Sequence, residues 1–321
     1  MQAYIIKEIN QPPFKTEAAI PVPNDDEALV KISASALNHR DVWITKGQYP
    51  GIKLGAIMGA DGCGTWEGKE YVINPGLDWG TDEAYQSVDF RVLGVPDDGT
   101  FAEFICIPKK YLHEKPSFLT VEEAAALPLA GVTAFRALVV KTKPKAGDKV
   151  LISGIGGGVA LFAMQYAIAL GCDVYVTSGK EDKIEKAISL GAKGGYLYHD
   201  LDWPKKLMAE IGGVDIVIDS AGGSGFNNLV KVCNPGARIS FYGGSLGKLD
   251  GLNPQLIFWR QISLLGSTMG SDQDFVDMLA FVHKYKIRPV VDEVLSFNDL
   301  LLGFQKMEAG KQFGKIVFKH N

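Results

Sequence analysis

The chain has 321 residues, which is long enough for two domains of ordinary size. Hydrophobic residues make up 46% and charged residues 22%, a composition typical of globular proteins. Lys and Arg number 33 against 37 Asp and Glu, and no long run of like charge occurs. This balance argues against nucleic acid or an anionic membrane surface as the main partner.

The N-terminal segment and the cysteines are typical of a cytoplasmic protein. MQAYIIKEIN lacks the continuous apolar core of a signal peptide, and the longest apolar stretches are too short for a membrane span. The four cysteines are widely spaced without a C-x-x-C pair, and the five histidines form no H-x-x-x-H pattern. We therefore expect a cytoplasmic protein with reduced cysteines, no membrane segment and no metal site.

The first 120 residues have the pattern of β-strands. Runs of β-branched and apolar residues bounded by Gly and Pro occur at ALVKISASAL (28–37), KEYVINPG (69–76) and GTFAEFICIPKKYL (99–112). A helix is predicted to begin at Thr120, because Thr120 followed by Glu123 makes a capping box.

From Lys149 onward, strands alternate with helices. Helices are predicted at about 160–170, 181–190, 203–211 and 225–232, between strands at 149–153, 173–177, 196–198, 215–219 and 237–243. Repeated strand–helix units of this length require right-handed crossovers and a parallel sheet. The fold class is therefore α/β, with a doubly wound parallel sheet in a nucleotide-binding domain at 121–269. A later helix at 272–285 and a terminal strand GKIVFK are expected to return to the first domain.

The stretch SGIGGGVA (153–160) joins the first of these strands to its helix. Gly154 and Gly156 begin a G-x-G-x-x-G pattern, but Val159 stands where the third glycine is expected. A strand, a glycine turn and a helix in this order favour a dinucleotide site, because small residues let backbone N–H groups approach a pyrophosphate. The alternative is a glycine-rich turn that only closes a strand–helix unit.

The end of the second strand indicates which dinucleotide is bound. NAD sites usually carry an acidic residue there, whereas this strand ends VTSGKEDK, with Ser178 and Gly179 in the turn and Lys183 close by. A hydroxyl and an ammonium would accept a 2′-phosphate, so NADP(H) is the expected cofactor. Glu181 and Asp182 are also near and leave NAD(H) as the alternative.

With these residues in place, the chain resembles the medium-chain dehydrogenase/reductase superfamily, and most of all its zinc-free, quinone oxidoreductase-like branch. The matching segments are LNHRDVWITKGQYPG (37–51), GADGCG (59–64), GTFAEFICIP (99–108), EEAAALPLAGVTAFRAL (122–138), DIVIDSAGG (215–223) and GKIVF (314–318). The resemblance implies a β-rich GroES-like catalytic domain, formed by 1–120 together with 270–321, beside a Rossmann domain at 121–269. It also implies a homodimer that pairs through the strand at 262–269.

The zinc enzymes of this superfamily provide a test. The resemblance places their metal ligands at Asn38, Ala60 and Leu129, and none of these side chains is a usual zinc ligand. No metal is therefore expected.

The resemblance also assigns candidate site residues. Asn38 would contact the nicotinamide or its ribose, and Tyr49 would donate a hydrogen bond or a proton to the substrate. Read in steps of three, the glycine turn gives Gly154, Gly157 and Ala160, with Gly156, Gly157 and Gly158 beneath the pyrophosphate. The remaining candidate cofactor residues are Thr133, Val159, Ser178, Gly179, Lys183, Tyr198, Ser220, Tyr242, Gly243 and Ser245.

These observations favour an NADPH-dependent oxidoreductase that reduces a quinone or the C=C bond of an α,β-unsaturated carbonyl compound without a metal. A non-catalytic NADPH-binding sensor on the same fold is the main alternative, because a fold does not determine a function. A zinc alcohol dehydrogenase is a further alternative.

Overall fold

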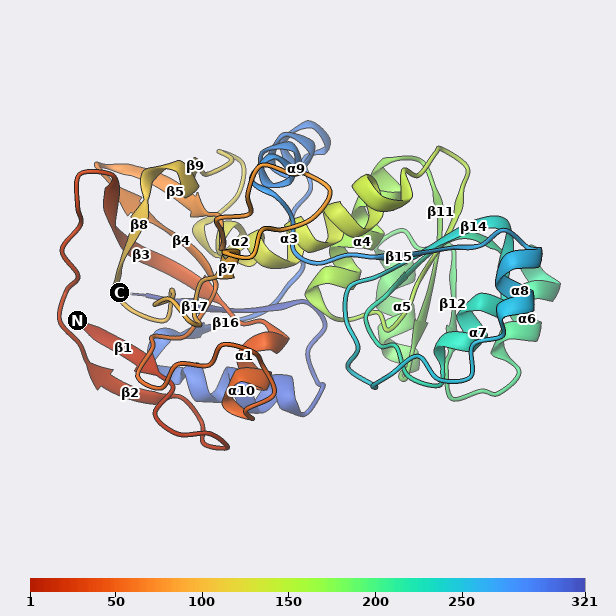
Figure 1. Cartoon of the computed structure of the whole chain (residues 1–321), viewed down its shortest axis with the longest axis horizontal. Coiled ribbons are helices and arrows are strands. Elements are labelled where there is room, and N and C mark those ends of the chain that lie inside the picture. The colour runs from red at the N-terminus through yellow and green to blue at the C-terminus, as the bar shows by residue number, and fades with distance from the viewer. Residues whose placement is uncertain (321) are drawn as a thin grey trace. The chain divides into compact units, whose positions relative to one another are not determined.

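The computed structural model describes residues 1–320, which form two compact units (Figure 1). Unit 1 comprises Met1–Val132 and the segment from Gly270 onward, and unit 2 comprises Thr133–Met269. The strand and helix pattern predicts that the Rossmann domain begins at residue 121. In the structure, α2 (Val121–Ala126) packs against β3 (Glu27–Ala36) and β4 (Asp61–Trp66), so this helix belongs to unit 1.

Unit 2 is built on a parallel six-stranded sheet of order β12-β11-β10-β13-β14-β15. Its strands are β10 (Lys149–Ile152), β11 (Asp173–Ser178), β12 (Gly194–Leu197), β13 (Val214–Asp219), β14 (Cys233–Phe241) and β15 (Ser263–Gly266). This is the doubly wound order of a Rossmann fold, as predicted. The direction of winding reverses between β10 and β13, so ligands are expected at the carboxyl ends of these strands.

Helices cover both faces of this sheet. Figure 1 shows α4 and α5 on one face and α6 and α7 on the other. The helices of unit 2 are α4 (Gly158–Ala169), α5 (Glu181–Ser189), α6 (Trp203–Ile211), α7 (Phe226–Lys231) and α8 (Pro254–Trp259). Glycines with positive φ follow α4, α5 and α6, at Gly171, Gly191 and Gly212, and end these helices where the pattern predicted. Earlier in the chain, α3 (Pro128–Phe135) and a π-helical turn (Arg136–Val140) precede β10.

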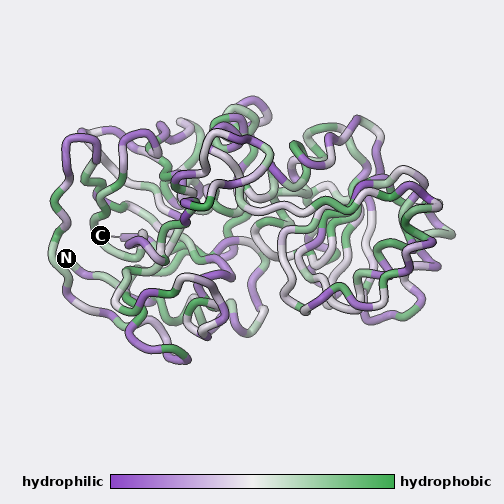
Figure 2. The backbone as a smooth tube through the Cα atoms, in the orientation of Figure 1, coloured by the Kyte–Doolittle hydropathy of each residue, from purple (hydrophilic) through white to green (hydrophobic). Residues whose placement is uncertain are grey.

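The core of unit 2 is formed by the strands and the inner faces of the helices. Trp203 and Leu207 of α6 and Phe226 of α7 are buried against Leu151 and Ile239 of the sheet. Figure 2 shows hydrophobic segments along these strands and hydrophilic segments mainly in the loops. Among residues 1–320, no helix is both long enough and apolar enough to cross a membrane.

Unit 1 is rich in antiparallel strands. Its main sheet has the order β16-β17-β3-β4-β5-β9, and β8 pairs with the first half of β3. Besides β3 and β4, its strands are β1 (Gln2–Ile5), β2 (Phe14–Glu17), β5 (Lys69–Ile73), β6 (Gly76–Leu77), β7 (Arg91–Val92), β8 (Phe104–Pro108), β9 (Leu112–Glu114), β16 (Val291–Ser296) and β17 (Lys315–Lys319). Its helices, besides α2, are α1 (His39–Thr45), α9 (Asp272–Tyr285) and α10 (Leu300–Glu308), with 3-10 turns at Lys109–Tyr111 and Phe297–Asp299. The antiparallel pairing of β17 with β3 joins the C-terminal segment to the N-terminal strands.

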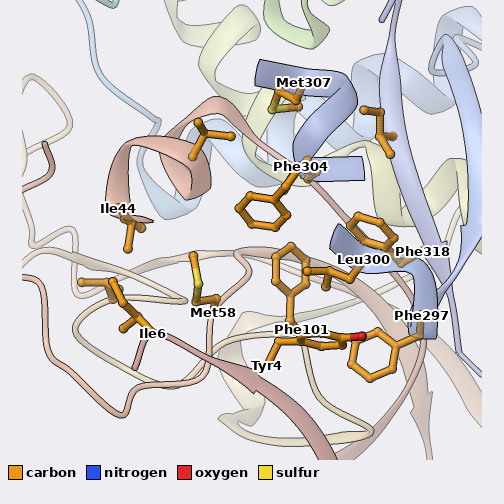
Figure 3. Close-up of a cluster of buried hydrophobic side chains, with 14 residues drawn as sticks. Tyr4, Ile6, Ile44, Met58, Phe101, Phe297, Leu300, Phe304, Met307 and Phe318 are labelled. Atoms are coloured by element: carbon orange, nitrogen blue, oxygen red, sulfur yellow. The ribbon is translucent and has the colours of Figure 1, made fainter. Parts of the chain in front are cut away.

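An aromatic cluster fixes α10 against the sheet of unit 1 (Figure 3). The Phe101 ring meets Phe318 of β17 edge-on at 5.6 Å between centroids and Phe304 of α10 at 6.3 Å. Gly303 permits this packing, because a Cβ there would lie 2.6 Å from the Phe318 ring. The cluster therefore ties residues from both ends of the chain into one core.

Candidate functional site

The glycine turn between β10 and α4 uses its glycines in different ways. Gly154 has φ 64° and Gly156 has φ 123°, conformations that other residues rarely adopt. A Cβ on Gly156 would also lie 2.9 Å from Cδ of Lys183. Gly157 has φ −81°, and a Cβ there would meet nothing within 4 Å. The first two glycines are thus needed for the shape of the turn, and the third leaves open space.

This open space lies at the N-terminus of α4. Gly157 is the N-cap residue of that helix, and it has no side chain with which to accept a hydrogen bond from the first turn. Gly158 and Val159 begin the helix, so their backbone N–H groups belong to the helix end that carries partial positive charge. Ala160 is buried and permits close packing of α4 on the sheet. The turn has the features of a pyrophosphate-binding helix terminus.

The turn is hydrogen-bonded to the end of β11. The Gly154 N–H donates to Oγ1 of Thr177 at 3.2 Å, and the Ile155 N–H donates to the Thr177 carbonyl at 2.8 Å. Thr177 was absent from the predicted site. Its position at the carboxyl end of a strand next to β10 is the signal that could have identified it.

Ser178 and Gly179 follow Thr177 and lie beside the end of β12. The Tyr198 N–H donates to the Ser178 carbonyl at 3.0 Å, and Nε2 of His199 lies 2.7 Å from the Gly179 carbonyl oxygen. A Cβ on Gly179 would lie only 2.5 Å from the Tyr198 hydroxyl. The structure therefore brings Ser178, Gly179 and Tyr198 together, and it adds His199, which sequence reasoning missed.

From α5, the side chain of Lys183 approaches the glycine turn and the end of β11. The Lys183 ammonium would lie 3.1 Å from a Cβ on Gly156, so this side chain extends across the glycine turn. Glu181 and Asp182 lie in the first turn of α5 and are exposed.

Asp219 organises the end of β13. Its carboxylate accepts hydrogen bonds from the backbone N–H groups of Ala221 at 3.2 Å and Gly222 at 2.8 Å, and from the Ser153 hydroxyl. Asp219 is only 1% exposed, so these bonds compensate for the burial of its charge. This second missed residue also lies at the carboxyl end of a strand next to β10.

Four predicted residues meet beside Asp219. The Tyr242 N–H donates to the Asp219 carbonyl at 3.0 Å, and the Ser245 N–H donates to the Ser220 carbonyl at 3.4 Å. A Cβ on Gly243 would lie 2.7 Å from that same Ser220 oxygen, so glycine is needed there. Ser220, Tyr242, Gly243 and Ser245 therefore form one group of loop residues.

Thr133 is placed differently from the other predicted cofactor residues of unit 2. It lies in α3, is 5% exposed, and its hydroxyl contacts Sδ of Met269 at 3.9 Å. Its predicted contact with the nicotinamide stays a prediction.

A closed network of polar side chains surrounds Asn38 in unit 1. The Lys315 ammonium donates to Oδ1 of Asn38 at 2.7 Å, to the Leu37 carbonyl at 2.8 Å and to Oδ2 of Asp61 at 2.8 Å. Nδ2 of Asn38 donates to the same Asp61 oxygen at 2.9 Å, and the Leu129 N–H donates to the other carboxylate oxygen at 2.8 Å. Both ends of the Asn38 amide thus have a partner, and its second N–H remains able to donate a further hydrogen bond.

The residues at the positions of the zinc ligands do not fit zinc. The Asn38 amide oxygen accepts a hydrogen bond from an ammonium, and Ala60 has no donor atom. Cys63 in β4 is fully buried, and burial raises the pKa of its thiol to about 12. Within residues 1–320, no group of three His, Cys, Asp or Glu side chains could hold a metal ion.

Tyr49 lies in the loop that follows α1. The side chain is half-buried and packs against the hydrophobic core cluster of unit 1 that contains Phe101 and Phe304. The Arg40 guanidinium lies over the ring, 4.7 Å from its centroid. Neither Arg40 nor Lys315 was predicted as part of the site, because no local pattern indicates which distant loop a buried cation reaches.

Two family models match the chain. Residues 24–117 match the alcohol dehydrogenase GroES-like domain, and residues 158–284 match the zinc-binding dehydrogenase domain. These matches correspond to parts of unit 1 and of unit 2.

Individual relatives cover most of the chain. It is 35% identical to the zinc-type alcohol dehydrogenase-like protein YogA of Leptosphaeria maculans, over 93% of this chain and 92% of that protein. It is 25% identical to the quinone oxidoreductase of Homo sapiens, over 80% and 76% of the two chains. A solved structure titled as an NAD-dependent alcohol dehydrogenase is 35% identical, with a TM-score of 0.93 and 99% of both chains covered. The chain therefore belongs to the medium-chain dehydrogenase/reductase superfamily and is an oxidoreductase.

Proposed function

We propose that this protein is an NADPH-dependent, zinc-independent reductase of quinones or of the C=C bond of α,β-unsaturated carbonyl compounds. The observation that carries the coenzyme assignment is the end of β11. There Gly179 lies directly under the Tyr198 hydroxyl, and no carboxylate occupies the end of the strand. The relationship to quinone oxidoreductases supports the substrate class.

The 2′-phosphate of NADPH would meet favourable groups at this place. Ser178 and Tyr198 offer hydroxyl groups, and Lys183 offers positive charge. An aspartate in place of Ser178 or Gly179 would repel that phosphate and favour the free ribose hydroxyl of NADH. The relative whose title names NAD makes NADH the competing coenzyme, and the two must be compared directly.

Each part of the chain has a defined task in this proposal. When bound, the reduced nicotinamide supplies the hydride. The N-terminus of α4 binds the pyrophosphate through backbone N–H groups, and the Asp219 carboxylate holds the loop after β13 in place. Tyr49 donates a hydrogen bond, and finally a proton, to the substrate atom on which negative charge develops. Its hydroxyl belongs to a half-buried side chain, so solvent can return the proton.

The zinc-independent part of the proposal rests on the Asn38 network. An ammonium held at 2.7 Å from the Asn38 oxygen and 2.8 Å from the Asp61 oxygen already neutralises the charge of this cluster. A divalent cation would have to displace it. Elemental analysis of the purified, active protein should find less than one tenth of an equivalent of zinc, and one equivalent per chain would favour the alcohol dehydrogenase alternative.

We also propose a cytoplasmic homodimer. The edge strand β15 carries no charged residue and no proline, so nothing in its sequence opposes pairing with a second copy. The four cysteines are free thiols, as a reducing compartment requires.

The coenzyme assignment is tested by titration. Lys183→Met and Tyr198→Phe should each raise the Kd for NADPH about tenfold and change the Kd for NADH less than twofold, because only NADPH carries the 2′-phosphate. Lys193→Met, which removes an exposed lysine paired with Asp173, is the matched control and should change neither Kd. Equal losses for both coenzymes would contradict the assignment.

The reaction class is tested by steady-state oxidation of NADPH with a panel of quinones, enals and enones. We expect turnover with at least one class, and Tyr49→Phe should lower kcat at least tenfold while changing the Kd for NADPH less than twofold. Tight NADPH binding with no turnover by the wild type would instead favour the sensor alternative.

A further inference from the structure

Arg40 is a buried cation that takes no part in the proposed reaction. It lies in α1 and is only 6% exposed. Its Nη1 donates to the Leu93 carbonyl at 2.7 Å, and its Nη2 approaches the Val95 carbonyl at 3.4 Å. The guanidinium plane is therefore fixed by the loop that follows β7.

No carboxylate fully compensates the charge of Arg40. The nearest one, Oδ1 of Asp41, lies 3.9 Å from Nη1, and this oxygen has no hydrogen-bond partner within residues 1–320. Nε of Arg40 has none there either. Burial of a guanidinium with such incomplete pairing costs free energy, so stability alone does not account for an arginine at this position.

The Tyr49 ring also contacts the guanidinium. The cation lies 4.7 Å from the ring centroid, within the range of a cation–π interaction. Tyr49 also packs against the hydrophobic core cluster that contains Phe101 and Phe304. The loop that carries it contains Gly47 and Gly51, both with positive φ, so its own backbone gives the tyrosine little support from regular structure.

We propose that Arg40 is a positioning residue that fixes the ring of Tyr49 and thereby the direction in which its hydroxyl points. Arg40 itself touches no substrate. This inference rests on the proposed function, in which the Tyr49 hydroxyl meets the substrate.

A double-mutant cycle on kcat tests the inference, with NADPH and the best substrate of the panel. Arg40→Lys keeps the charge but loses the planar fork that reaches both carbonyls. We expect this variant to lower kcat about tenfold, with the KM for NADPH changed less than twofold. In a Tyr49→Phe background the same substitution should change kcat less than twofold, because the hydroxyl it positions is absent.

Arg238 provides the matched control. It also donates to two backbone carbonyls, those of Thr142 at 2.6 Å and Lys143 at 3.1 Å. Arg238→Lys should leave kcat within twofold of the wild type. If Arg40→Lys fails to fold, Arg40→Gln, which can still donate to the Leu93 carbonyl, is carried through the same cycle.

The outcomes separate this inference from the function on which it rests. If Arg40→Lys lowers kcat equally in the wild type and in the Tyr49→Phe variant, or in neither, the positioning role is overturned while the reductase activity stands. A wild type that turns over but is unaffected by Tyr49→Phe overturns the role of Tyr49 and the inference together. A wild type with no turnover on the panel overturns the proposed function, and the inference falls with it.

Discussion

The glycine turn of unit 2 and the side-chain network around Asn38 of unit 1 differ in how far their hydrogen-bonding groups have partners within the protein. At the proposed pyrophosphate site of unit 2, the groups available for hydrogen bonds are mostly backbone N–H groups, and a Cβ on Gly157 would meet open space. Around Asn38 in unit 1, each hydrogen of the Lys315 ammonium has an acceptor, and each oxygen of the Asp61 carboxylate accepts at least one hydrogen bond. A site that awaits a ligand leaves donors available, whereas a structural network satisfies its own.

This difference changes the interpretation of Asn38. Asn38 has a structural role in this network, and its predicted contact with the cofactor stays a prediction. Removing a side chain from the network of Asn38, Asp61 and Lys315 should therefore lower the free energy of unfolding. Filling the open space at Gly157 should instead weaken the binding of NADPH.

The largest expected effect is on stability, in Lys315→Met. The substitution leaves the Asp61 carboxylate buried without its cation, so the free energy of unfolding should fall by about 3–5 kcal/mol. Urea denaturation monitored by circular dichroism measures the change.

Lys46→Met is the control for this variant, because its partner Glu308 lies 3.1 Å away and both side chains are more than 40% exposed. The loss there should stay below about 1 kcal/mol. Equal effects at Lys46 and Lys315 would show that the buried network does not contribute as a closed unit.

The next effect is on binding, in Gly157→Val. At φ −81° with open space around the Cβ, valine fits the protein itself, so the melting temperature should be unchanged. The side chain would occupy the space of the pyrophosphate and raise the Kd for NADPH at least ~100-fold, a loss of about 3 kcal/mol.

Gly156→Ala serves as the contrasting variant at this turn. Positive φ and the contact with Lys183 should make it lower the melting temperature as well as the affinity. Wild-type affinity in Gly157→Val would refute our interpretation of the turn.

The sequence predicted unit 2 more completely than unit 1, for a physical reason. Strand–helix alternation is local, and glycines with positive φ mark helix ends, so β10 through β14 and α4 through α7 were found nearly in full. The capping box at Thr120 was also correct, with the Glu123 N–H donating to its hydroxyl at 3.2 Å. The helix α1, hidden within the motif around Asn38, was not predicted.

Some residues of the candidate site could likewise be predicted from local sequence, and others could not. Ser178 and Gly179 could be placed from the end of the second predicted strand, and the family resemblance supplied Tyr198. The contacts of Lys315 and Arg40 could not be predicted, because a long side chain reaches residues that are distant in sequence. The distance of 254 residues between Lys315 and Asp61 carries no local signal.

A smaller effect on stability than that of Lys315→Met concerns His320, a buried side chain of unit 1 in which one of the two ring nitrogens has a partner. Its Nε2 lies 2.9 Å from the Ser35 hydroxyl, its ring stacks on Phe297, and its Nδ1 has no hydrogen-bond partner within residues 1–320. Burial lowers the pKa of this imidazole from 6.5 to about 3. The native state therefore resists protonation, and the stability is complete above pH 6.5 and is lost as the pH falls towards 3.

At pH 5 the expected loss is about 2 kcal/mol, since each pH unit below 6.5 corresponds to about 1.4 kcal/mol. Asp41 acts in the opposite direction, because burial raises its carboxyl pKa to about 6 and acidification from 6 to 3.8 favours the native state. The wild-type profile combines both groups, so the measurement is the difference between wild type and His320→Gln in urea denaturation at pH 7 and pH 5. The wild type should lose about 2 kcal/mol more than the variant, whereas parallel profiles would mean that His320 is protonated in the native state without cost.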